Sequence, residues 1–112
     1  MLQVNERMVA VDDEGYLLDP EDWNRDVALA LAQSVEIDLD DQHWEVVHFV
    51  RDFYEKNQTV PEARHALKYL AQKFGKDVVN RKFLYRLFPY GYGQQACKIA
   101  GMRKPLKLML DV

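Results

Sequence analysis

Features that would assign a function directly are scarce in this sequence. Its 112 residues include one cysteine, Cys97. A single cysteine cannot form an intrachain disulfide, and a free thiol fits a reducing compartment. No apolar run approaches the roughly 20 residues that a membrane-spanning helix needs, and the first residues lack the basic and apolar regions of a signal peptide. We therefore expect a cytoplasmic protein that does not associate with membranes.

Catalytic and ligand-binding motifs are equally few. There is no glycine-rich phosphate loop, no internal repeat and no Ser-His-Asp arrangement that spacing would support. His43 and His48 are five residues apart, so a helix places them on different faces, where they cannot share a metal ion as an i, i+4 pair can. We expect neither a metal site nor a cofactor.

What the sequence does have is a strong separation of charge. Residues 1–56 hold 15 acidic and 4 basic residues, whereas residues 57–112 hold 3 acidic and 11 basic ones, for a net charge of −3. Such a separation favours an acidic partner or a polyanion at the basic half. The alternative is that the two halves lie close together in the fold and form an ordinary solvated surface.

Local signals predict one mainly α-helical domain over residues 1–112, a small orthogonal bundle of about five helices. We assign residues 1–18 to an N-terminal β-hairpin region, 19–102 to the helical core and 103–112 to a C-terminal arm. Short strand-like pieces at 2–4 and 8–11 flank a polar turn, and 16–18 is expected to return to them.

Capping and stop signals divide the helical core. The first helix is expected to start at Asp19 or Asp22, with Trp23 in its buried stripe. A capping box formed by Thr59 and Glu62 is expected to open the third. The four later helices are expected at 42–56, up to 74, 81–88 and 92–102. The carboxylates of 38–41 are expected to cap the helix 42–56, and Asn80 and Pro89 are the expected cap and stop of the helix 81–88. The helix 42–56 is apolar over about half of its circumference, which predicts the centre of the core.

The helix that ends at residue 74 and the helix 81–88 also describe a helix-turn-helix pair, because a short turn joins them and the second is basic. DNA binding is the minor alternative that this pair leaves open. Most such pairs only pack, and this one has few side chains that read base edges.

The helix expected at 92–102 carries the single thiol. Its apolar stripe consists of Tyr92, Ala96, Ile99 and Ala100. At α-helical spacing Cys97 lies at the edge of this stripe, which predicts partial exposure. Lys98, Arg103 and Lys104 are near enough in sequence to lower the pKa of the thiol and make it reactive. The alternative is that Cys97 is a small buried hydrophobe.

Short motifs recur in order through nearly the whole chain. They are Asp13–Leu17, Asp22-Trp23, His43–Val47, Arg51–Tyr54, Pro61 with Arg64, Leu84–Gly91, Gln95–Gly101 and Lys104-Pro105. Together they resemble the DsrC/TusE family of sulfur-relay proteins, also called the gamma subunit of dissimilatory sulfite reductase. The resemblance implies a mainly helical fold with a small hairpin and a C-terminal arm, and protein partners of a sulfur-transfer or sulfite-reductase system.

The resemblance also implies a chemistry. Members of the family carry sulfur as a persulfide on a cysteine near the end of the arm and deliver it in tRNA wobble-uridine thiolation. Others use a second cysteine on the preceding helix and form a trisulfide between the two in sulfite reduction or sulfur oxidation. Cys97 matches the helix cysteine, whereas about Leu108 stands where relatives have the arm cysteine, and the chain continues to Val112.

Without a thiol on the arm, the usual persulfide mechanism cannot operate, so Cys97 is the only candidate for a sulfur-bearing thiol. Arg64 and Lys104 occupy positions where relatives have basic residues near the arm. With Arg103, they are our candidates for contacts with an anion or a partner, and the alternative is that they are solvated charges. The sequence leaves three roles open: a divergent sulfur-relay protein that uses Cys97, a regulatory or adaptor paralogue without transfer chemistry, or, as the minor alternative, a DNA-binding regulator.

Overall fold

A computed structural model of the chain describes residues 1–103, so the predicted arm lies outside the described residues except for Arg103. The predicted class is confirmed: the described residues form a mainly α-helical fold with a two-stranded antiparallel hairpin at the N-terminus. The elements are β1 (Leu2–Val4), β2 (Arg7–Val9), the 3₁₀ turn η1 (Pro20–Asp22), α1 (Arg25–Ser34), α2 (Asp41–Asn57), α3 (Ala63–Phe74), α4 (Arg81–Leu87), the π-helical turn η2 (Tyr92–Ala96) and α5 (Cys97–Ile99).

The N-terminal hairpin pairs Leu2 with Val9, so its second strand starts and ends earlier than the sequence predicts. Val9 is buried, whereas the far side of the ribbon is open to solvent. A single antiparallel bridge pairs Leu17 with Val11, two residues after β2, so the predicted return of residues 16–18 is made to the segment that follows the sheet. The hairpin region therefore contributes one edge of the core.

The first predicted helix is wrong in its start. Pro20–Asp22 forms only a 3₁₀ turn capped by Asp19, and the chain then extends through Trp23 before α1 begins. The side chain of Asn24 accepts a hydrogen bond from the backbone N–H of Val27 (2.9 Å) and caps α1. Trp23 thus lies between two helical segments, where its indole can reach the end of α5.

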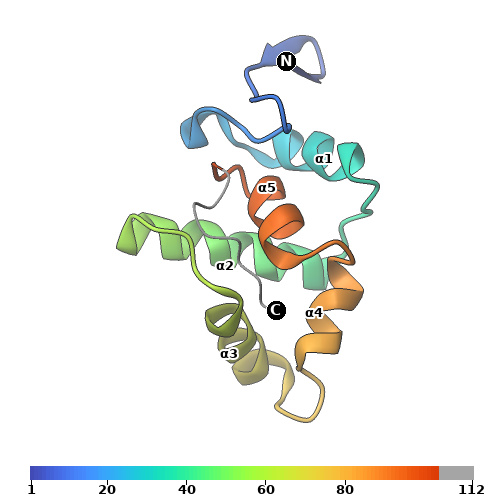
Figure 1. Ribbon diagram of the computed structural model, residues 1–112, viewed down its shortest axis with the longest axis vertical. Helices are drawn as coiled ribbons and strands as arrows, with labels where there is room; N and C mark the ends of the chain where they lie inside the picture. The colour runs from blue at the N-terminus through green and yellow to red at the C-terminus, as the bar shows by residue number, and fades with distance from the viewer. Residues whose placement is uncertain (104–112) are drawn as a thin grey trace.

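Helix α2 is the centre of the core, as predicted. Asp40 caps it by accepting from the backbone N–H of His43 (3.0 Å), and Val46, Val47 and Val50 have no exposed surface. Figure 1 shows α5 lying between α1 and α2, and both helices contact it. The segment that carries the thiol is therefore enclosed from two sides.

Helices α3 and α4 follow each other at the end of the molecule opposite the hairpin (Figure 1). The expected capping box at Thr59 is wrong, because Glu62 is itself the cap, and its backbone N–H donates to Nδ1 of His65 (3.0 Å). Asn80 caps α4 as predicted. The rings of Phe74 and Phe83 pack 6.3 Å apart and join the two helices.

The fifth predicted helix is not a regular one. Residues 92–96 form a π-helical turn, and α5 adds only three residues before Gly101 adopts φ +78°. Residues 1–103 therefore contain four regular helices rather than about five, with a short mixed segment in the fifth place.

Candidate functional site

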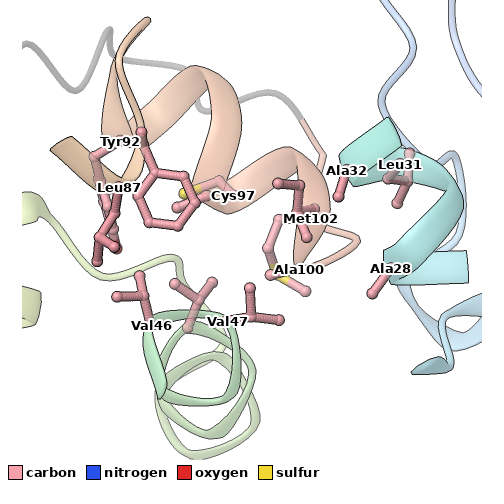
Figure 2. Packing of buried hydrophobic residues seen from close by; sticks show 14 of the residues in the cluster. Ala28, Leu31, Ala32, Val46, Val47, Leu87, Tyr92, Cys97, Ala100 and Met102 are labelled. Atoms are coloured by element: carbon pink, nitrogen blue, oxygen red, sulfur yellow. The ribbon is translucent and has the colours of Figure 1, made fainter. Parts of the chain in front are cut away.

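The thiol of Cys97 lies inside the protein. Its residue has no exposed surface. Figure 2 shows its side chain beside the ring of Tyr92, in the buried cluster that also contains Val46 and Val47 of α2. The expected partial exposure is wrong because the preceding turn is π-helical. The backbone N–H of Cys97 bonds to the carbonyl of Tyr92, five residues back, so the wider turn brings Cys97 over Tyr92 on the buried face.

Burial also decides the acidity of this thiol. Loss of water raises the pKa of Cys97 to about 12, and a hydrogen bond with the side chain of Tyr92 offsets only part of the effect. Because a thiolate is the reactive form, on the order of one molecule in 10⁵ would be charged at neutral pH. The expectation that neighbouring cations lower this pKa is therefore wrong for the described cations.

Those cations bind elsewhere. The ammonium of Lys98 donates to the carbonyl of Glu14 (2.7 Å) and lies 4.8 Å from the centre of the Tyr16 ring. Arg103 donates to the carbonyl of Leu18 (3.5 Å). Both side chains thus tie the end of the described chain to residues 14–18, and neither serves the thiol. The remaining candidate, Lys104, lies outside the described residues.

Arg64 is exposed in the first turn of α3 and pairs with Glu62 (2.9 Å). Within residues 1–103, no hydrogen bond or ion pair joins it to Arg103 or to Cys97. Arg64 and Arg103, the two described residues among the three basic candidates, therefore do not form one site. Their roles toward an anion or a partner stay predictions.

A cluster that the sequence did not predict holds the last described turn. Trp23 donates its indole N–H to the carbonyl of Ile99 (2.8 Å), and Arg51 donates to the carbonyls of Ala100 (2.8 Å) and Pro20 (3.1 Å). The guanidinium of Arg51 also lies 4.4 Å from the centre of the Trp23 ring. This cluster fixes the direction in which the chain leaves α5.

Gly101 completes this cluster. A Cβ atom there would lie 2.5 Å from Cδ1 of Trp23, and φ is +78°, so only glycine fits without strain. Trp23 and the glycine after the cysteine helix are visible in the sequence. Their contact could not be predicted, because the two residues lie 78 positions apart.

His43 is a buried polar residue with a structural role. Its Nε2 bonds to the carbonyl of Leu87 (2.8 Å), and its Nδ1 lies 2.9 Å from the Asp40 carboxylate. The ring therefore joins the start of α2 to the end of α4. Among residues 1–103, no three His, Cys, Asp or Glu side chains gather in a way that could hold a metal ion.

An open cavity of about 240 Å³ lies between the end of α1 and η2, lined by residues that include Glu36, Tyr90 and Gln94. Cys97 does not line it, so the cavity gives no access to the thiol. In the described part of the chain, no helix is both long and apolar enough to cross a membrane.

Known proteins that resemble this chain agree on one family. The model of the family described as DsrC like protein matches residues 3–109. A sulfurtransferase TusE homolog of Haemophilus influenzae is 47% identical over 109 residues, which span 97% of this chain and 100% of the relative. The sulfurtransferase TusE of Escherichia coli is 45% identical over 107 residues, or 96% of this chain and 98% of that protein.

Solved structures give the same result. The oxidized gamma subunit of the dissimilatory sulfite reductase (DsrC) from Archaeoglobus fulgidus superposes with a TM-score of 0.89 at 33% identity, covering 96% of this chain and 97% of that one. DsrC of Allochromatium vinosum gives a TM-score of 0.84 at 40% identity, with 96% of each chain covered. The chain described here therefore belongs to the DsrC/TusE family of sulfur-relay proteins.

Proposed function

We propose that this chain is an adaptor of a sulfur-relay system, which binds protein partners of a sulfur-transfer or sulfite-reductase system without carrying sulfur itself. The observation that carries the proposal is the burial of Cys97, the single cysteine of the sequence. A sulfur carrier must present a thiolate to a donor and then to an acceptor. A thiol with no exposed surface and a pKa of about 12 does neither in the folded protein.

Partner binding is supported by family membership and by the fold. The described relatives are named sulfurtransferases or a subunit of a sulfite reductase. This chain keeps their architecture over nearly its whole length while its one thiol is part of the core. An adaptor needs the architecture and not the thiol. The names of the relatives described above give no support to the alternative of DNA binding through α3 and α4.

Intact mass before and after treatment with a persulfide donor tests the proposal. We expect the native protein to keep its mass, because the donor cannot reach Cys97. The same protein treated in denaturant should gain the mass of one sulfur atom, which shows that the donor is competent. Cys97→Ala should gain none in either state.

A gain of one sulfur by the native protein, absent in Cys97→Ala and reversed by a reductant, would contradict the proposal. It would show that the folded state opens around α5 and that Cys97 is the sulfur-bearing thiol of a true carrier.

A further inference from the structure

The α3–α4 lobe, residues 62–87, differs in charge from the rest of the molecule. It holds seven Lys and Arg residues against two acidic ones, Glu62 and Asp77, and residues 78–103 contain no acidic residue at all. The lobe lies at the end of the molecule opposite the N-terminal hairpin (Figure 1). The lobe therefore gathers much of the basic charge at one end of the molecule. The two halves of the chain still touch, because α2 packs against α3, and Lys98 and Arg103 bind carbonyls of residues 14 and 18.

Most of the lobe's cations make no ion pair with another described residue. Arg64 pairs with Glu62, and Lys73 pairs with Glu45 of α2 (3.2 Å). The others make no ion pair within residues 1–103 and are exposed; they are Lys68, Lys76, Arg81, Lys82 and Arg86. Exposed cations that no carboxylate neutralises are available to a partner of opposite charge.

The solvent face of α4 combines these cations with an aromatic side chain. Lys82, Tyr85 and Arg86 are three and four residues apart, so they lie together on one face of the helix. Tyr85 is 45% exposed. Arg86 is held in place over the ring of Phe83, 4.9 Å from its centre. The opposite face of α4 is buried, so this face is the part that a partner can reach.

We propose that the solvent face of α4 is a docking surface for an acidic segment of a partner protein. Carboxylates of the segment would pair with Lys82 and Arg86, and one of its apolar side chains would cover Tyr85. Exposed tyrosine and arginine at the centre of a patch are typical of protein interfaces. The inference rests on the proposed function, because it names the chemistry of the partner that the adaptor binds.

The charge of the remaining surface favours a short acidic segment over a nucleic acid. Residues 1–56 hold 15 acidic and 4 basic residues, which would repel a polyanion that extends beyond the lobe. A protein segment can confine its carboxylates to the length of α4. A second copy of this chain could also offer acidic residues, and sedimentation would detect its binding as self-association.

The first probe is a labelled synthetic peptide rich in Glu with one Leu and one Phe, and its binding is followed by fluorescence anisotropy at several salt concentrations. We expect the double variant Lys82→Glu, Arg86→Glu to weaken binding by about tenfold or more, because charge reversal turns attraction into repulsion. Tyr85→Ala should weaken it by several-fold while leaving the salt dependence unchanged.

A matched control is Arg7→Glu, Lys56→Glu. Both residues are exposed outside the lobe, the change in net charge is the same, and Lys56, like Arg86, lies in the last turn of its helix. We expect binding within about twofold of the unmodified protein, because these residues lie away from the docking surface. An equal loss in the two double variants would overturn the proposal, since it would show attraction by net charge alone.

Two further results would overturn it. One is tighter binding of a single-stranded oligo(dT) than of the peptide, abolished by the lobe variant, which would make the surface a nucleic-acid site. The other is self-association in sedimentation that only the lobe variant removes, which would make the occupant a second copy. Failure here is separable from failure of the adaptor role, because the sulfur content of Cys97 is a separate readout that these variants leave untouched.

Discussion

The region around α5 and the α3–α4 lobe carry the same kinds of residue, but they use them differently. Lys98, next to the thiol, is bound to the carbonyl of Glu14, whereas Lys82 on α4 has no ion pair among the described residues. Around α5, the side chains of Lys98 and Arg103 donate to backbone carbonyls. On the lobe, five of the seven cations make no ion pair with another described residue. The availability of a charge therefore depends on the carbonyls that the fold brings near it, and not on its distance from a cysteine in sequence.

Two glycines give the largest expected difference between the regions. Gly101 and Gly75 both have positive φ, so an alanine at either strains the backbone by about 1–3 kcal/mol. At Gly101 the new Cβ also meets Trp23 at 2.5 Å, whereas at Gly75 it meets nothing within 4 Å. We expect Gly101→Ala to lower the free energy of unfolding by about 1–3 kcal/mol more than Gly75→Ala in urea titrations.

Equal losses in the two glycine variants would contradict the rigid packing of Trp23 and Arg51 on the end of α5.

The pH dependence of stability gives the next largest effect. The folded protein holds the Cys97 proton with a pKa of about 12, above the value of about 8.5 for an exposed thiol. Stability from this group is therefore complete below about pH 8.5 and falls as pH rises toward 12. Between about pH 8 and about pH 10, we expect the unmodified protein to lose about 1–2 kcal/mol more than Cys97→Ala.

Urea titrations of both proteins at the two pH values measure this difference. Parallel losses would mean that the thiol ionises as easily in the folded protein as in the unfolded chain.

The smallest expected effect is the difference in stability between variants of Lys98 and Lys82. Lys98→Met removes a hydrogen bond to a carbonyl and a contact with the Tyr16 ring, so we expect a loss of about 1 kcal/mol. Lys82→Met removes only a solvated charge, and stability should stay within about 0.5 kcal/mol. Thermal unfolding would measure the loss of stability in each variant. A larger loss for Lys82→Met than for Lys98→Met would show that the cations of the lobe stabilise the fold.

Local signals predicted most of the fold. Asn80 and Pro89 bracket α4 because a cap and a stop act on the helix beside them. Asp40 and the apolar face of α2 identified the central helix in the same way. The start of the first helix was placed too early, because Pro20–Asp22 closes a 3₁₀ turn and the cap of α1 is Asn24, two residues after Asp22.

The candidate site was harder to predict, because it depends on contacts between distant residues. A π-helical turn at 92–96 rotates Cys97 onto the buried face, and no composition rule at α-helical spacing reveals such a turn. The partners of Lys98 and Arg103 lie 84 and 85 residues away. Arg51 belongs to one of the family motifs, but only the structure shows that it donates to the carbonyls of Ala100 and Pro20.

The rate at which iodoacetamide alkylates Cys97 in the native protein, followed across a urea titration, tests the account most directly. We predict a native rate at least about a thousandfold below that of the unfolded chain, rising with urea in step with global unfolding, because the thiol opens only when the core does. A native rate equal to that of a free peptide thiol at the same pH would contradict the account and restore Cys97 as an accessible sulfur-bearing group.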